Sequence, residues 1–380
     1  MRLGRAGTLN TLGELQKADE LLAIVAEHAS DAGRPDLRAR ARIGSARIAT
    51  KQGRGADALS AIADAETISE ELNDLSLQAR TGLMAAYVRW WFEEAGDAAV
   101  ADLRRCLAIA EQLDEPGLLI EVRNKLGTLL YNIGDLAGAD EHFTGLIALA
   151  GEAGSVRDQA RATCQLALVK YHLGALIEAE ELSLQASDWL ERTGDRFNQL
   201  QNLRTLALCA AARSDFELAD ERLRAAVPLA LEVGGALVVE IYRILVDVLI
   251  SLGRLDDARE LAVFAFRSVP EEDAYARAAG LLIEASLRTA EGRADIAIES
   301  FAKALQLLEQ QGLPLDLGEA RLAYGRALRR LGDEVAARTE LGRAREGLSK
   351  MGALGLVDEI DRELARLAEE AGLAGPLASA

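Results

Sequence analysis

The stretch that decides the fold is GDLAGADEHFTGLI, residues 134–147. An alanine (Ala139) follows its first glycine by five residues, and large apolar residues stand at Phe143 and Leu146. This spacing places three side chains on one face of an α-helix. The pattern recurs every 39 to 41 residues, and its anchor alanines are Ala18, Ala58, Ala99, Ala139, Ala179, Ala219, Ala258, Ala297 and Ala337.

A second set of small residues keeps the same phase. Roughly seven residues before each turn stand Ala6, Ala46, Ala86, Gly127, Ala167, Ala207, Val246, Ala285 and Gly325. Two small side chains in step let two helices approach closely across a short turn. One such pair cannot bury its own apolar face, so neighbouring pairs must stack. We therefore predict an all-α superhelix of about nine helix-turn-helix repeats over residues 1–353, a capping helix over 354–373 and a frayed tail over 374–380.

Composition and charge agree with a stack of helices. The chain of 380 residues is half apolar but only 4% aromatic, so alanine and leucine, both strong helix formers, must supply most of the core. The net charge of −18 repels nucleic acids and anionic membranes. The three cysteines lie in apolar helical surroundings, and the N-terminus lacks the apolar stretch of a signal peptide. We expect a cytoplasmic protein with buried free thiols and no nucleic-acid or membrane partner.

No pattern of residues points to catalysis or to a cofactor. His28, His142 and His172 are too far apart in sequence for an evident metal site. GRGADA, residues 53–58, has a dinucleotide-binding spacing, but a predicted helix precedes it instead of a strand. Neither a nucleophile–base pair nor a phosphate-binding loop occurs in the sequence. We therefore predict a protein that is not an enzyme, with no catalytic residue, no metal and no cofactor.

The anchor pattern resembles tetratricopeptide repeats, in which small residues stand where paired helices touch and the usual period is ~34 residues. Longer repeats of this kind are similar to the sensor region of MalT-like transcription regulators. They also resemble the C-terminal repeats of large bacterial signalling proteins that carry an ATPase, and in some cases a nucleotide cyclase or a DNA-binding domain. LGEARLAYGRALRRLGDEVAARTEL, residues 317–341, is especially like those regions. The resemblance implies sensing of a protein or ligand and implies no catalytic residue.

The same resemblance implies a binding surface, because the first helix of each pair lines the concave face in such superhelices. Arginine, tyrosine and asparagine at those positions suit an extended acidic peptide or other carboxylate groups. Glu121, Glu240 and Asp247 stand at neighbouring positions and could neutralise the arginines instead. The candidate ligand- or peptide-binding residues of this groove are Asn124, Tyr131, Asn132, Arg161, Tyr171, His172, Arg204 and Arg243.

We therefore predict a peptide- or protein-binding scaffold, the regulatory or sensor module of a bacterial signalling or transcription-regulatory protein. One alternative is a small-ligand sensor that gates an adjacent ATPase, cyclase or DNA-binding domain, which an apolar pocket near Tyr131 and Tyr171 would favour. The other is a self-assembling structural protein. Its homo-oligomeric contact would come from the uncovered end of repeat one or from Trp90-Trp91-Phe92, which otherwise forms a core repacked around an insertion.

Overall fold

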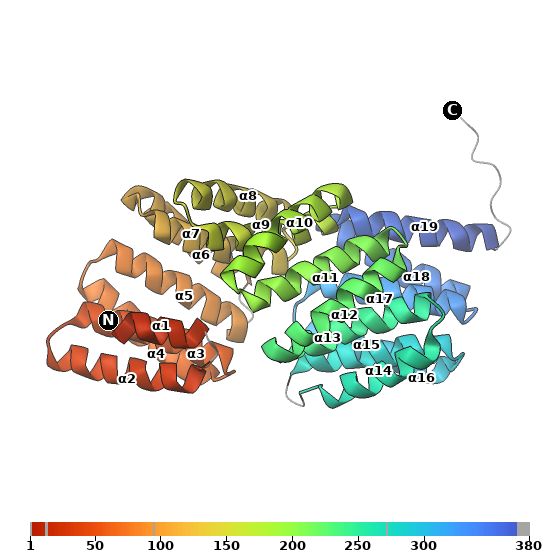
Figure 1. Ribbon diagram of the computed structural model, residues 1–380, viewed down its shortest axis with the longest axis horizontal. Helices are drawn as coiled ribbons and strands as arrows, with labels where there is room; N and C mark the ends of the chain where they lie inside the picture. Colours follow the sequence, from red (N-terminus) through yellow and green to blue (C-terminus); the bar gives the residue numbers. More distant parts are fainter. Residues whose placement is uncertain (1, 12–13, 94–95, 271–272, 371–380) are drawn as a thin grey trace. The chain divides into compact units, whose positions relative to one another are not determined.

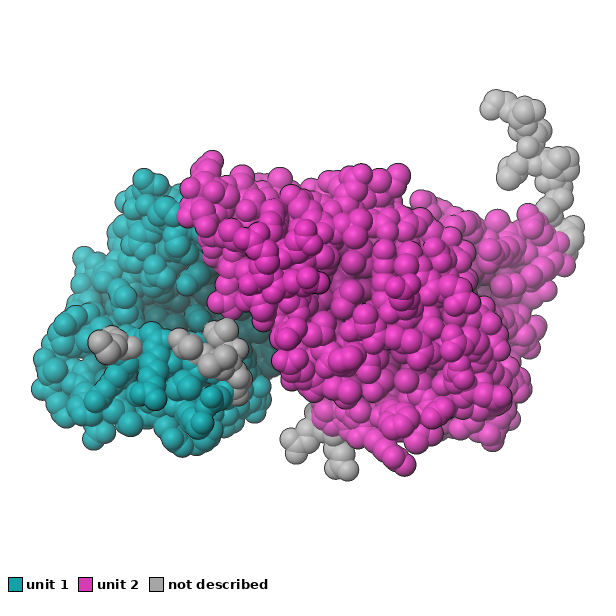
Figure 2. Space-filling model, in the orientation of Figure 1, with its two compact units in different colours: residues 1–129 teal, residues 130–380 magenta. Residues whose placement is uncertain are grey.

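The computed structural model describes residues 2–11, 14–93, 96–270 and 273–370. Within these ranges every regular element is an α-helix, and the helices are numbered α1 to α19 (Figure 1). They form nine consecutive pairs followed by α19, as the repeat phase predicts. The chain divides into two compact units, residues 1–129 and 130–380 (Figure 2), and each is described by itself.

The helices of the first unit have nearly uniform length, as a repeat array requires. Their bounds are α1 Arg2–Thr11, α2 Leu15–Asp31, α3 Pro35–Lys51, α4 Gly55–Glu71, α5 Leu75–Glu93, α6 Gly96–Leu113 and α7 Pro116–Asn132, whose last residues belong to the second unit.

The second unit continues the same alternation of long helices and short turns. Its helices are α8 Leu136–Glu152, α9 Val156–His172, α10 Leu176–Thr193, α11 Arg196–Ala212, α12 Phe216–Val233, α13 Ala236–Ser251, α14 Leu255–Arg267, α15 Ala274–Ala290, α16 Ala294–Gln310, α17 Pro314–Arg330, α18 Glu334–Lys350 and α19 Leu354–Glu370.

The anchor alanines do what the sequence predicts. All nine are buried, with at most 2% of their surface exposed. Each lies in the second helix of its pair, facing the first helix. At Gly325 even a methyl group would lie 2.6 Å from Leu341, so the backbones of α17 and α18 approach as closely as their side chains allow. The predicted succession of paired helices is therefore confirmed over the residues that the structure describes.

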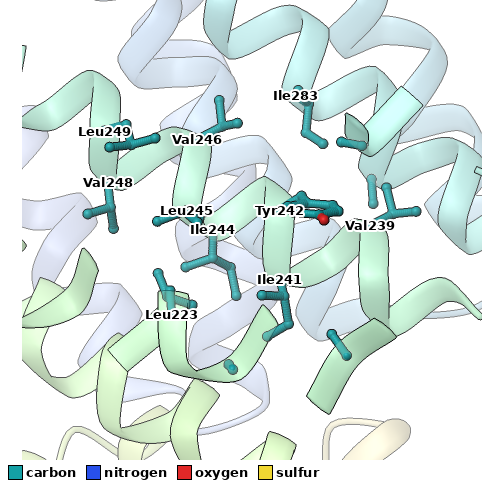
Figure 3. Packing of buried hydrophobic residues seen from close by; sticks show 14 of the residues in the cluster. Leu223, Val239, Ile241, Tyr242, Ile244, Leu245, Val246, Val248, Leu249 and Ile283 are labelled. Carbon is teal, nitrogen blue, oxygen red and sulfur yellow. The ribbon is translucent and has the colours of Figure 1, made fainter. Parts of the chain in front are cut away.

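The core of the second unit is built around α13. Leu245, Val246 and Leu249 on this helix pack against Leu223 of α12 and Ile283 of α15 (Figure 3). Apolar side chains surround most of α13 because helices cover it on several sides. Nevertheless, no helix in the described ranges is both long and apolar enough to cross a membrane.

The two ends of the second unit meet. In the turn between α7 and α8, a methyl group on Gly134 would collide with the side chain of Met351, which follows α18. In the turn between α9 and α10, the backbone of Gly174 touches Gly355 at the start of α19. Helix α19, drawn in blue in Figure 1, contacts α9. We call these contacts between Gly134, Gly174, Met351 and Gly355 the seam.

The last described helix, α19, lies where the sequence predicts a capping helix. The predicted capping helix is α19, which buries Leu356, Ile360 and Leu367 and ends at Glu370. Residues 371–380, including the predicted tail 374–380, lie outside the described residues. The repeat phase runs through the division between the two units, and the prediction of a single repeat domain over residues 1–353 stays a prediction.

The turn between α11 and α12 contains a residue with a strained backbone conformation. Ser214 occupies the place that glycine holds in most of the other repeats, and its φ is 62°. A side chain in this left-handed conformation costs about 1 kcal/mol, which glycine avoids. We therefore expect Ser214→Gly to raise the free energy of unfolding by about 0.5–1 kcal/mol in urea denaturation.

The matched control is Ser60→Gly, an exposed serine inside α4. Glycine lowers stability there, by about 0.5 kcal/mol, because the position is helical. An equal loss at both positions would contradict the strain assigned to Ser214.

Candidate functional site

Polar side chains from five helices converge on the inner face of the second unit. They come from the end of α7 and from α9, α11, α13 and α17, so every contributing helix is the first of its pair. Leu208, Ile244 and Leu315 complete the lining. We call the polar members the interior cluster, which consists of Tyr131, His172, Arg204, Glu240, Arg243, Asp316 and Glu319.

His172 lies at the centre of the α7–α9 side. Its Nε2 is 2.9 Å from the hydroxyl of Tyr131, and Tyr171 packs edge-on against its ring at 5.0 Å. Only 3% of its surface is exposed. Burial, followed by the nearby Arg204 charge, lowers the pKa of His172 to about 3. The imidazole is therefore neutral at physiological pH.

Arg204 and Glu240 form an ion pair between α11 and α13. Both are nearly buried, with 11% and 7% of their side chains exposed. Burial alone would lower the pKa of Arg204, but the carboxylate of Glu240 outweighs it and raises that pKa. Because each charge is buried and neutralises the other, loss of either side chain would destabilise the fold.

Arg243 lies one turn further along α13 and points toward Asp247, with 3.7 Å between Nη1 and Oδ2. Burial raises the pKa of Asp247, although 40% of its side chain is exposed. Asp247 is therefore more exposed to solvent than His172, of which 3% is exposed.

Two acidic side chains on α17 face the cluster without a close cationic partner among the described residues. Asp316 accepts a hydrogen bond of 3.1 Å from the hydroxyl of Tyr275 on α15. Glu319 Oε1 lies 3.8 Å from His172 Nδ1, too far for a hydrogen bond. Burial raises the pKa of Glu319 to about 7, so this carboxyl is partly protonated at neutral pH.

Two of the residues that line the cavity each carry a buried nitrogen without a hydrogen bond to any described residue. Within the described chain, His172 Nδ1 and Arg204 Nε have no hydrogen-bond partner. The cavity has a volume of about 30 Å³, enough for about one water molecule. Ligand pockets are typically ~300–1,000 Å³. The site therefore has unused hydrogen-bonding groups but no room for a ligand of several atoms.

The structure brings together half of the eight predicted groove residues. Tyr131, His172, Arg204 and Arg243 belong to the interior cluster, and Tyr171 packs behind it. Arg161 instead pairs with Asp195 at 3.5 Å, and Asn132 ends α7 outside the cavity lining.

Asn124 lies in the first unit. The expected open groove is closed at the cluster because α17 and α19 pack against the α7–α9 side.

Sequence reasoning missed Tyr275, Asp316 and Glu319. Glu319 could have been found, because it stands thirteen residues before its turn glycine, the same place that Glu240 holds in its own repeat. Asp316 and Tyr275 lie nearer the start of their helices. They bond to each other across neighbouring repeats, at positions that precede those considered for the groove.

A second, larger groove lies in the first unit between α2 and α4, with α3 as its floor. Its volume is about 510 Å³, and small residues such as Ala23, Ser45 and Ala61 line it. At one end Arg54 pairs with Asp19 and Asp57, which joins α2 to α4. The guanidinium of Arg54 is therefore already paired with two carboxylates of the protein.

The aromatic stretch at the end of α5 divides between core and surface. Phe92 packs against the core of the first unit and lies where a side chain on Gly55 would collide with it. Trp91 is 54% exposed and touches Trp90 edge-on at 5.7 Å. Phe92 therefore supports the prediction of a repacked core, and a contact role for Trp91 stays a prediction.

No protein-family model and no curated protein matches the sequence. Solved structures do match, and they are helical repeat proteins of the tetratricopeptide type. The chain therefore has the tetratricopeptide-like α-α superhelical fold that the sequence resemblance implies.

Three of these structures illustrate the similarity. A Rap protein complexed with competence and sporulation factor has a TM-score of 0.68 and 14% identity, over 96% of this chain and 98% of that one. The Rap conjugation gene regulator of the plasmid pLS20 in complex with the Phr* peptide has a TM-score of 0.65 and 13% identity, over 92% and 97%. A signal transduction ATPase with a tetratricopeptide repeat sensor from Pyrococcus horikoshii has a TM-score of 0.54 and 16% identity, over 70% of this chain and 42% of that one.

The Arg204–Glu240 pair makes a first prediction for the site. Arg204→Ala leaves Glu240 buried without its partner, so we expect a loss of about 3–5 kcal/mol in the free energy of unfolding. The double change Arg204→Met with Glu240→Leu removes both charges and should cost far less. Urea denaturation of the two variants measures the difference. Equal losses would show that the pair is not buried as described.

Glu319 makes a second prediction, on pH. Its pKa rises on folding from 4.5 to about 7, so the folded state holds a proton that the unfolded state has lost between these pH values. The stabilisation is complete below pH 4.5 and disappears as pH rises through 7. Glu319→Gln should therefore stabilise the protein at pH 8, by about 1–2 kcal/mol, and have little effect at pH 4.5.

The control for this change is Glu309→Gln, at an exposed position on α16. It should give the same stability difference at both pH values. A pH-independent effect of Glu319→Gln would contradict the raised pKa.

Proposed function

We propose that this chain is a non-catalytic peptide-binding module of a cytoplasmic bacterial regulatory protein, and that the peptide binds on the inner face of the second unit. The observation that carries the proposal is the convergence of buried polar groups from α7, α9, α11, α13 and α17. Two of their nitrogens, His172 Nδ1 and Arg204 Nε, have no hydrogen-bond partner in the described chain. A peptide backbone supplies acceptors for the Arg204 N–H, and both a donor and acceptors for the His172 nitrogen.

Two structures with a similar fold support a peptide as the class of ligand. One Rap structure is described with competence and sporulation factor, and the other with the Phr* peptide. Both cover nearly all of this chain with the same fold. Repeats of one fold serve many roles, so the fold alone does not identify the ligand. The interior cluster supplies the polar groups from which we argue where a peptide would bind.

An acidic peptide is the narrower form of the proposal. Arg204 and Arg243 are the available cations, and each already faces an acidic residue of the protein, Glu240 or Asp247. A ligand carboxylate would have to replace one of these. The exchange is easier at Arg243, because its partner Asp247 is 40% exposed and lies 3.7 Å away.

A small-ligand sensor is less well supported. The cavity beside Tyr131 is lined mainly by charged and polar groups and measures about 30 Å³, far below the typical size of a pocket for a small organic ligand. We therefore place the peptide along the inner face, with the cluster as its most buried contact.

The experiment uses a pool of randomised nine-residue peptides passed over the immobilised full chain, with retained peptides identified by mass spectrometry. We expect enrichment of peptides rich in Asp and Glu. Arg243→Gln should lower their retention about tenfold, because it removes the more accessible cation.

Arg267→Gln is the matched control, since Arg267 is an exposed arginine at the end of α14. It removes the same charge and should leave retention unchanged. Retention that falls equally in both variants would reject the inner face as the site, and retention no higher than on an unrelated protein would reject the peptide-binding function.

A further inference from the structure

We propose that the seam is a gate, and that the contact of α19 with the turns after α7 and α9 must open before a peptide reaches the interior cluster. This inference rests on the proposed function and adds how its site is controlled. The contacts that define the gate join Gly134 to Met351 and Gly174 to Gly355. All four residues belong to the second unit.

The cavity at the interior cluster is too small to admit a peptide. The cavity at the interior cluster holds about 30 Å³. A peptide side chain with its backbone needs several times that space, and sites for organic ligands usually begin at ~300 Å³. His172 is 97% buried on one side of this cavity, and Glu319 of α17 closes the other side at 3.8 Å. The elements around the cluster must therefore separate for a ligand to touch His172.

The seam is the contact around the second unit that separates most easily. Neighbouring helices around the unit interlock through buried anchor residues such as Ala179, Ala219 and Ala258, which continue the repeat packing. The seam interrupts this packing, because there two glycines meet backbone to backbone. A methyl group added to Gly355 would lie 3.0 Å from the Cα atom of Gly174 and from the carbonyl oxygen of Tyr171. The glycines themselves contribute little apolar surface, and the apolar contacts across the seam come from Tyr131, Leu136 and Leu173. Because α19 contacts α9 over far fewer residues than the two helices of a pair contact each other, the seam is easier to separate than the repeat packing.

Tyr131 connects the seam to the interior cluster. Tyr131 packs its ring against the apolar cluster of α17, α18 and α19, together with Leu136 and Leu173. Its hydroxyl bonds to His172 Nε2. Glu319 sits on α17, which belongs to the same apolar cluster as α19. If these three helices move as one body, opening the seam carries Glu319 away from His172 and frees both groups for a ligand.

A reversible disulfide provides the test. A Cβ atom on Gly134 would lie 3.5 Å from the Cβ atom of Met351, within the range of natural disulfides, and Met351→Cys removes the sulfur and methylene that crowd Gly134. The chain's own thiols, Cys106, Cys164 and Cys209, are buried, so oxidation should pair only the two new cysteines.

The double variant Gly134→Cys with Met351→Cys is probed with the same pool of nine-residue peptides, once oxidised and once reduced. We expect reduction to raise peptide retention about tenfold, a typical size for coupling between two states. Because both measurements use the same polypeptide, its folding is controlled, and circular dichroism of the two forms checks this directly.

A second variant opens the gate instead of locking it. Gly355→Leu forces a side chain against Gly174 and should raise peptide retention and the amide hydrogen exchange of residues 354–370. Gly342→Leu on α18 is the matched control, because a side chain there meets nothing within 4 Å. It should change neither measurement.

The outcomes separate the gate from the function on which it rests. Retention that is low when oxidised and restored by reduction supports the gate. Equal retention by oxidised and reduced protein overturns the gate and leaves the peptide-binding function standing. If neither the wild type nor the reduced variant retains any peptide, the proposed function fails and the gate fails with it.

Discussion

The fold depends on close contact between the two helices of each pair, which only small side chains permit. Ala139, Ala179 and Ala219 are fully buried where the second helix of a pair meets the first. A larger side chain at such a position would push the helices apart and leave a gap beside it, because protein interiors are close-packed. The regular stack, and with it the alignment of first helices along one inner face, follows from this single constraint.

The stack brings polar residues together under conditions that change their chemistry. Arg204, Glu240 and Glu319 would be ordinary surface residues on isolated helices. On the inner face of the second unit they lose most of their water, so the arginine requires its glutamate and the carboxyl of Glu319 is raised to a pKa of about 7. The same desolvation makes the cluster costly to build and makes each polar group that lacks a hydrogen bond there unfavourable.

The sequence predicted the fold well because the fold is local. The position of Ala58 or Ala297 depends on residues within one repeat, and periodicity reports it directly. Four of the predicted groove residues, including His172 and Arg204, line one cavity for the same reason, and their role in binding stays a prediction. The closure of the second unit was not predictable in this way. Contact between Gly174 and Gly355 depends on small rotations summed over several repeats.

The glycine contact at the seam also limits how this protein can change in length. Solenoids usually tolerate the gain or loss of a repeat, since each unit touches only its neighbours. Here the chain between Gly174 and Gly355 must return to its starting point, and inserting or deleting one helix pair would carry the two glycines past each other. A repeat could therefore be gained or lost in this unit only with loss of the contact between Gly174 and Gly355.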